Sequence, residues 1–191
     1  MINPNLEVVL IEGDIIFINN LNPVSREVAR VCQTWATHIG IIFFEEDVWQ
    51  VAESTFPFSR KITLQKFIDN SHGGQLEIYR VENLSYNDIL ELKKASNSYM
   101  RIPYDLCFNY DSKWLYCSKF VYLTYLNALK IKIGKVETFR DMIESNPNFN
   151  LAFWRLWYLG RIPWDKKCIS ISSIISNRIL TKVYPFSSTQ L

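Results

Sequence analysis

The sequence predicts a single α+β domain that spans residues 1–191. Three observations predict this class. Segments rich in β-branched and aromatic residues fill much of the chain up to residue 81, two long helix-like segments follow Ser85, and no repeat, low-complexity block or linker separates them. A chain of 191 residues is long enough to bury a substantial core in one domain.

The predicted strands are apolar or alternating segments bounded by turn residues. LEVVLIEGDIIFINN (6–20) predicts two strands broken at Glu12-Gly13, the second of them within DIIFI (14–18). THIGIIFFEEDVWQVAEST (37–55) predicts an antiparallel hairpin around an acidic turn. QLEIYRV (75–81) predicts a further strand.

Two long helices are predicted from residue 85 onward. The first covers SYNDILELKKASNSYM (85–100), where Ser85 and Asp88 form a capping arrangement at its start. The second runs from about Tyr116 to Leu129. Short helices are predicted at 64–71 and 139–145, and residues 22–35 are taken as a connecting segment.

Charge and composition restrict the class of protein. The net charge is +2 and no block of five or six like charges occurs, so we expect no nucleic-acid partner. No apolar run approaches the roughly 18 residues of a membrane-spanning helix. Glu7, Glu12 and Asp14 interrupt the N-terminal segment, which is therefore unlike a signal peptide. These features predict a cytoplasmic protein with no integral membrane segment.

The cysteines and histidines do not form a metal-binding pattern. Cysteine occurs at 32, 107, 117 and 168 without a C-x-x-C pair, and His38 and His72 stand 34 residues apart. We therefore expect no metal and no organic cofactor. With no export signal, the four thiols are expected to be reduced.

A histidine and a carboxylate meet in the predicted hairpin. If Glu45-Glu46 forms a two-residue turn, His38 lies directly opposite Glu53 on the same face, with Cβ atoms ~5 Å apart. A change of one residue in loop length would place the two side chains on opposite faces. The predicted pairing thus depends on the turn.

Cys117 stands at the start of the second long helix, where the helix dipole and free N–H groups stabilise a thiolate. Together, Cys117, His38 and Glu53 supply the nucleophile, the histidine and the orienting carboxylate of an activated-nucleophile unit. The other interpretation is structural. A cysteine among aromatic residues can be a small buried side chain, and a histidine in an apolar strand can be satisfied within the core.

Five segments of the chain carry a family resemblance. They are GDIIF (13–17), THIGIIF (37–43), VAEST (51–55), PYDLCFNYD (103–111) and YCSKFVY (116–122). In this order they resemble the motifs of the circularly permuted NlpC-type cysteine peptidases, the YiiX/YaeF group of papain-like proteins. The resemblance runs from Gly13 to about Tyr125, and ILTKVYPF (179–186) is loosely similar to that group's C-terminus. It implies a permuted papain-like fold, with a small antiparallel sheet or barrel packed against helices.

The resemblance also implies roles for individual residues. Cys117 matches the nucleophile, His38 the general base and Glu53 the polar residue that orients the histidine. Tyr104 matches the tyrosine of the Y-D motif, which implies a place near the substrate, although packing beneath the helix is the alternative. Asp14 is taken as a structural residue at a strand start.

One position departs from the family pattern. Lys119 stands where the family usually has an acidic residue after the Cys-Ser pair. It lies within one helical turn of Cys117, so its charge either favours the thiolate or points to solvent.

Together these features predict a cysteine hydrolase that cleaves a peptide or N-acyl amide bond through a thioester, acting on a small peptide or an acylated small molecule or lipid. Two alternatives stay open: a lipid acyltransferase or phospholipase of the lecithin:retinol-acyltransferase-like type, and a non-catalytic ligand-binding module on the same fold. The aromatic segment LAFWRLWYLGRIPW (151–164) either lines an apolar groove or forms a core helix.

Overall fold

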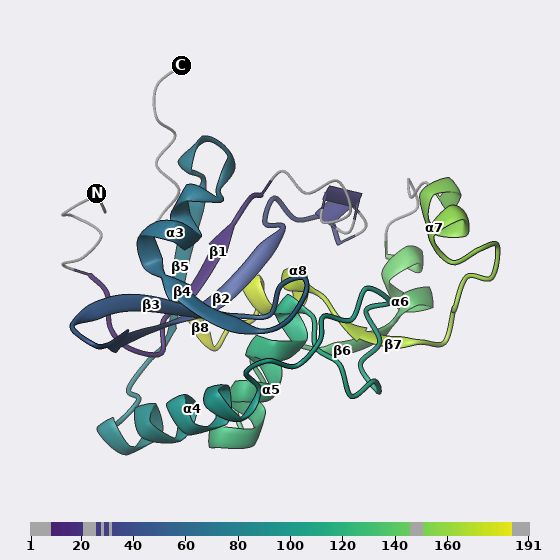
Figure 1. The fold of residues 1–191 in the computed structure, drawn as a ribbon. Helices are drawn as coiled ribbons and strands as arrows, with labels where there is room; N and C mark the ends of the chain where they lie inside the picture. Colours follow the sequence, from purple (N-terminus) through teal and green to yellow (C-terminus); the bar gives the residue numbers. More distant parts are fainter. Residues whose placement is uncertain (1–8, 21–25, 28, 31, 146–150, 185–191) are drawn as a thin grey trace.

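The structure is a computed structural model that describes residues 9–20, 26–27, 29–30, 32–145 and 151–184. Its main element is an antiparallel sheet of six strands in the order β4-β3-β2-β1-β5-β8 (Figure 1). The strands are β1 (Ile15–Ile18), β2 (His38–Glu45), β3 (Val48–Glu53), β4 (Arg60–Thr63), β5 (Leu76–Val81) and β8 (Leu180–Tyr184). β4 and β8 are the two edges, so the sheet is open. The predicted α+β class is confirmed, and the barrel alternative is wrong.

The helices and a small second sheet surround the main sheet. The helices are α3 (Leu64–Asp69), α4 (Tyr86–Ser98), α5 (Cys117–Leu129), α6 (Phe139–Glu144), α7 (Leu151–Trp157) and α8 (Ile171–Ile175), with a 3₁₀ turn, η1, at His72–Gly74. The second sheet pairs β6 (Val136–Thr138) with β7 (Lys167–Ile169). Within the described residues, no helix has both the length and the apolar character needed to cross a membrane.

The central strands are buried on both faces of the sheet, which explains their almost continuous apolar sequence. In β1, Ile15 and Phe17 belong to the core that includes α5, whereas Ile16 and Ile18 belong to the core that includes α3. Figure 1 shows α4 and α5 on one side of the sheet and α3 on the other. The N-terminus of α5, where Cys117 lies, is therefore fixed against the sheet.

The turn between β2 and β3 differs from the prediction by one residue. Glu45 pairs with Val48, so the turn residues are Glu46-Asp47 rather than Glu45-Glu46. Both have positive φ, 53° and 59°, as a type I′ hairpin turn requires. Aspartate tolerates this conformation better than most residues, which favours the observed turn.

The predicted helices are confirmed in position. α4 starts with the reciprocal capping box of Ser85 and Asp88, and α5 starts at Cys117 with Tyr116 as its N-cap. Residues 9–12, in contrast, are not the predicted first strand, since they lie in turns and irregular backbone; residues 6–8 are outside the described residues. The edge strands β4 and β8 were not predicted, because short edge strands carry charged residues instead of an apolar pattern.

Asp14 is held in a buried ion pair that ties β1 to β5. Its side chain is fully buried, and Arg80 donates to both carboxylate oxygens, from Nε to Oδ1 at 2.7 Å and from Nη2 to Oδ2 at 2.8 Å. Arg80 also donates to the Val9 carbonyl, and the Ile11 N–H donates to Asp14. Burial raises the pKa of Asp14, although the bonds from Arg80 and Ile11 oppose that effect. These contacts agree with the structural interpretation of Asp14.

Candidate active site

Cys117 is the first residue of α5 and is buried, with 7% of its surface exposed. Tyr116, the N-cap residue, gives no side-chain hydrogen bond to the helix start. The first N–H groups of a helix have no partner within the helix, and they place partial positive charge at this end. Cys117 therefore lies at the end of α5 where this partial positive charge is concentrated.

His38 and Glu53 form a short, buried hydrogen bond. His38 Nε2 lies 2.5 Å from Glu53 Oε2, and the glutamate side chain is 2% exposed. Because Ile41 pairs with Ala52, continuing the ladder by one step places Glu53 opposite Gly40, so the predicted direct pairing with His38 is wrong. The two side chains are diagonal neighbours on the same face, a separation that long side chains can bridge.

Gly40 lies on the same face of the hairpin and leaves room for the side chain of Val51. A Cβ at Gly40 would clash with Cγ1 of Val51 and would crowd the Ala52 carbonyl. The close approach of β2 and β3 therefore requires glycine at position 40, two residues from His38 on β2 and opposite Glu53 on β3.

The Cys117 side chain lies beside the His38 imidazole and contributes to its pKa. Since Nε2 faces Glu53, the other ring nitrogen, Nδ1, is left for the thiol. Burial disfavours the imidazolium, but the interactions with Cys117 and Glu53 outweigh it and raise the pKa of His38 to about 10. The protonated ring is thus favoured between the Glu53 carboxylate and the Cys117 side chain.

Arg60 is a further member of this cluster that the sequence reasoning missed. It lies directly opposite Glu53 across the β3–β4 ladder, and its Nε donates to Glu53 Oε1 at 2.8 Å. Burial alone would raise the pKa of Glu53, but the bonds from His38 and Arg60 outweigh it and lower that pKa. Had β4 been predicted, its pairing with β3 would have indicated that Arg60 lies opposite Glu53.

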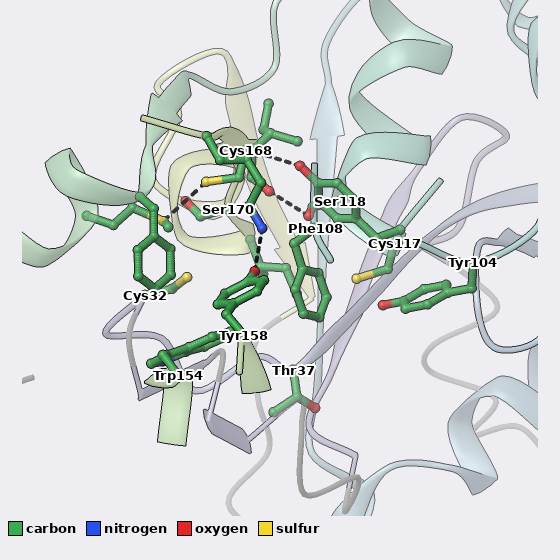
Figure 2. Close-up of a pocket in the computed structure, with 16 residues that line it drawn as sticks. Cys32, Thr37, Tyr104, Phe108, Cys117, Ser118, Trp154, Tyr158, Cys168 and Ser170 are labelled. Atoms are coloured by element: carbon green, nitrogen blue, oxygen red, sulfur yellow. Dashed lines mark hydrogen bonds between the residues drawn. The ribbon is translucent and has the colours of Figure 1, made fainter. Parts of the chain in front are cut away.

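Tyr104 contacts the cysteine directly. Figure 2 shows its phenol oxygen pointing toward the Cys117 sulfur, and the phenol interacts with both the side chain and the backbone N–H of Cys117. Burial, followed by the Cys117 charge, raises the pKa of Tyr104 well above its usual value, so the phenol stays protonated. The contact places Tyr104 beside the candidate nucleophile, and its role in substrate binding stays a prediction.

Lys119 does not point to solvent, as one of the two sequence interpretations held. It is 2% exposed, and its ammonium donates to three backbone carbonyls of the loop before α5: Asn109 at 3.2 Å, Ser112 at 2.5 Å and Trp114 at 2.8 Å. Burial lowers the pKa of Lys119. Its contacts therefore serve to hold the loop that leads into Cys117.

Replacing Lys119 by methionine is expected to lower the free energy of unfolding by about 1–3 kcal/mol, because carbonyls of this loop lose a charged donor. Urea unfolding of Lys119→Met measures this change. Lys113→Met is the matched control, since Lys113 is exposed on the same loop. Equal stability of the two variants would contradict the assigned role of Lys119.

An apolar pocket opens beside Cys117 (Figure 2). Its cavity volume is about 50 Å³. Tyr104 and Cys117 lie at one part of its wall, and α7 contributes Trp154 to another. Tyr158, just after α7, also lines it. Trp154 packs on Phe139 as well, with ring centroids 5.3 Å apart, so the aromatic segment both lines a groove and belongs to a core cluster.

An open antiparallel sheet that carries histidine and glutamate, followed later in the chain by a helix that begins with cysteine, is the arrangement of a permuted papain-like fold. The family described as "Permuted papain-like amidase enzyme, YaeF/YiiX, C92 family" matches residues 9–184, and the chain belongs to this family. The suspected family and its fold are thus confirmed.

Two similar proteins come from Escherichia coli. The uncharacterized protein YiiX of strain K12 is 26% identical over 172 residues, which cover 90% of this chain and 84% of YiiX. The crystal structure of metalloprotein yiiX from strain O157:H7 superposes with a TM-score of 0.85 at 25% identity, covering 91% of this chain and 96% of that one.

The word metalloprotein describes that relative. Among the residues that the present structure describes, no group of three or more His, Cys, Asp or Glu side chains is arranged to hold a metal ion. His38 and Glu53 are instead hydrogen-bonded to each other. The described donor set does not fit a metal, and no step below uses one.

Proposed function

We propose that this protein is a cysteine hydrolase that cleaves an amide bond through a thioester on Cys117. The observation that carries the proposal is the buried hydrogen bond between Glu53 and His38, with Cys117 at the start of α5 beside the same imidazole. In this proposal Cys117 is the nucleophile, His38 the general acid and base, and Glu53 the carboxylate that orients the imidazole.

The reaction begins from the thiolate–imidazolium pair. Cys117 Sγ attacks the carbonyl carbon, and the oxyanion that forms accepts hydrogen bonds from the Cys117 N–H and the Tyr104 hydroxyl. As the C–N bond breaks, His38 donates its proton to the leaving nitrogen. Water then attacks the thioester, His38 accepts a proton from that water, and the carboxylic acid leaves as the Cys117 sulfur is released.

The lining of the pocket favours an apolar acyl group. The wall beside Cys117 is built from aromatic and aliphatic side chains that include Phe108 and Trp154. An N-acyl amine or a peptide with an apolar side chain fits such a surface. The same observation supports a second candidate, acyl transfer from a lipid ester, because that chemistry uses the same nucleophile and the same acyl pocket.

Alkylation of the native protein tests the nucleophile without a known substrate. Treatment with limiting iodoacetamide at about pH 6 is expected to modify Cys117 before the other cysteines, because a cysteine at a helix start beside a protonated histidine is the most reactive kind. In His38→Ala the rate at Cys117 is expected to fall about tenfold or more, because the sulfur loses the neighbouring imidazolium that activates it. Mass spectrometry of the digested protein locates the modified cysteine.

The exposed Cys107 is the internal control for this labelling. If Cys117 reacts no faster than Cys107, or if His38→Ala leaves its rate unchanged, the non-catalytic binding module becomes the better interpretation. If Cys117 reacts selectively, hydrolysis of γ-linked peptides, N-acyl amines and phospholipids then separates the amidase from the lipid candidate.

A further inference from the structure

Glu53 is held at both of its oxygens. Oε2 faces His38 Nε2 at 2.5 Å, and Oε1 accepts from Arg60 Nε at 2.8 Å. The two partners come from the two strands that flank β3, His38 from β2 and Arg60 from β4. The carboxylate cannot rotate without breaking one of these bonds.

A single neutral hydrogen-bond partner is not enough to keep a buried carboxylate ionised. Glu53 is 2% exposed, and transfer of an isolated carboxylate from water to such a site is strongly unfavourable. His38 alone is a poor counterion, because it gives up its proton during each catalytic cycle of the proposed reaction. Arginine is a permanent cation in proteins, and the Arg60 side chain, 45% exposed, keeps partial contact with water.

We propose that Arg60 is a positioning residue for the proposed reaction, fixing Glu53 as an oriented carboxylate so that Glu53 holds His38 toward Cys117. The inference rests on the proposed function. It assigns to the edge strand β4 a part in the chemistry, although Arg60 itself touches none of the reacting atoms.

The expected pH dependence follows from the groups around Glu53. These are His38 from β2 and Arg60 from β4, with Cys117 of α5 acting through the imidazole. Arg60 and His38 lower the pKa of Glu53. Removal of Arg60 therefore raises that pKa, and Glu53 takes up its proton at a higher pH than in the wild type. The acid limb of the pH–rate profile for Cys117 alkylation is then expected to move to higher pH.

The test is the rate of Cys117 alkylation by iodoacetamide across about pH 4 to 8. Arg60→Gln is expected to react roughly tenfold more slowly than wild type near the acid limb, with a smaller difference at neutral pH. Arg60→Lys, which restores the cation, is expected to recover most of the reactivity. Arg60→Ala replaces Arg60→Gln should that variant fail to fold.

Lys61→Gln is the matched control. Lys61 is the next residue of β4, its side chain points to the opposite face, and it pairs with Glu45 at 2.6 Å. The control is expected to follow the wild-type profile, although it also loses an ion pair from the same strand. Urea unfolding confirms that the variants compared are folded.

Two results would overturn the proposal for Arg60. One is an Arg60→Gln profile that coincides with that of Lys61→Gln, and the other is a uniform loss of rate with no change in pH dependence, which indicates a structural role. Both differ from failure of the proposed function, in which wild-type Cys117 itself shows no selective reaction.

Discussion

Cys117→Ser is expected to lower kcat/KM by about 10⁴-fold or more, as removal of the nucleophile does in other hydrolases with such a unit. The serine hydroxyl is a far weaker acid than the thiol, and the site is built around a thiolate and an imidazolium whose pKa is raised to about 10. A neutral hydroxyl in place of the cysteine removes one of the two groups that raise the pKa of His38, and serine is a far weaker nucleophile unless the base removes its proton. The substrate is the one that the wild type hydrolyses fastest in the screen above.

Two other cysteines provide controls for this variant. Cys168 lines the same pocket, but burial raises its pKa to about 12, so it is a poor nucleophile. Cys107 is exposed, and the proposed reaction does not use its side chain. Cys107→Ser is expected to keep turnover within about threefold, and Cys168→Ala is expected to retain the acylated intermediate on Cys117. Acid-quenched samples of the wild type should also contain the acylated protein, which should be absent from Cys117→Ser. Substantial turnover by Cys117→Ser would argue against a thioester.

The pairing of His38 with Glu53 was predictable although the predicted register was wrong. When the two-residue turn shifts by one position along the chain, the residue that lies opposite a given residue changes by two positions. Side chains two residues apart in a strand point to the same face. A loop of two residues is therefore enough to predict that His38 and Glu53 share a face. It is not enough to predict which residue lies opposite Glu53, because the sequence does not indicate that Glu46 and Asp47 take positive φ.

The contacts of Arg60 and Lys119 were not predictable from local patterns. Arg60 meets Glu53 only because an edge strand with no apolar pattern pairs with β3. Lys119 appears on the sequence as a charge one turn from Cys117, and its burial depends on how residues 109–114 fold over the helix. The pocket likewise depends on segments brought to Cys117 from the last third of the chain, including Trp154. Such long-range contacts leave no periodic signal.

Arg80→Met is expected to lower the free energy of unfolding by about 3–5 kcal/mol at neutral pH, the cost of leaving a buried charge without its partner. Asp14 is fully buried and would lose the cation that binds both of its oxygens. A loss of this size is a large fraction of the stability of an ordinary domain. Urea unfolding at constant temperature measures it, and Lys94→Met is the control, because the Lys94–Glu91 pair is 3.8 Å long and exposed.

The pH dependence distinguishes a lost ion pair from lost packing. Arg80 lowers the pKa of Asp14 against the effect of burial, so its removal raises the folded-state pKa further above the unfolded value. A folded state that binds the proton more tightly gains stability as pH falls toward the unfolded pKa of about 3.9. The deficit of Arg80→Met should therefore shrink on acidification, and the double variant Asp14→Asn/Arg80→Met should recover part of it at neutral pH. A deficit that is independent of pH would mean that the arginine stem acts by packing alone.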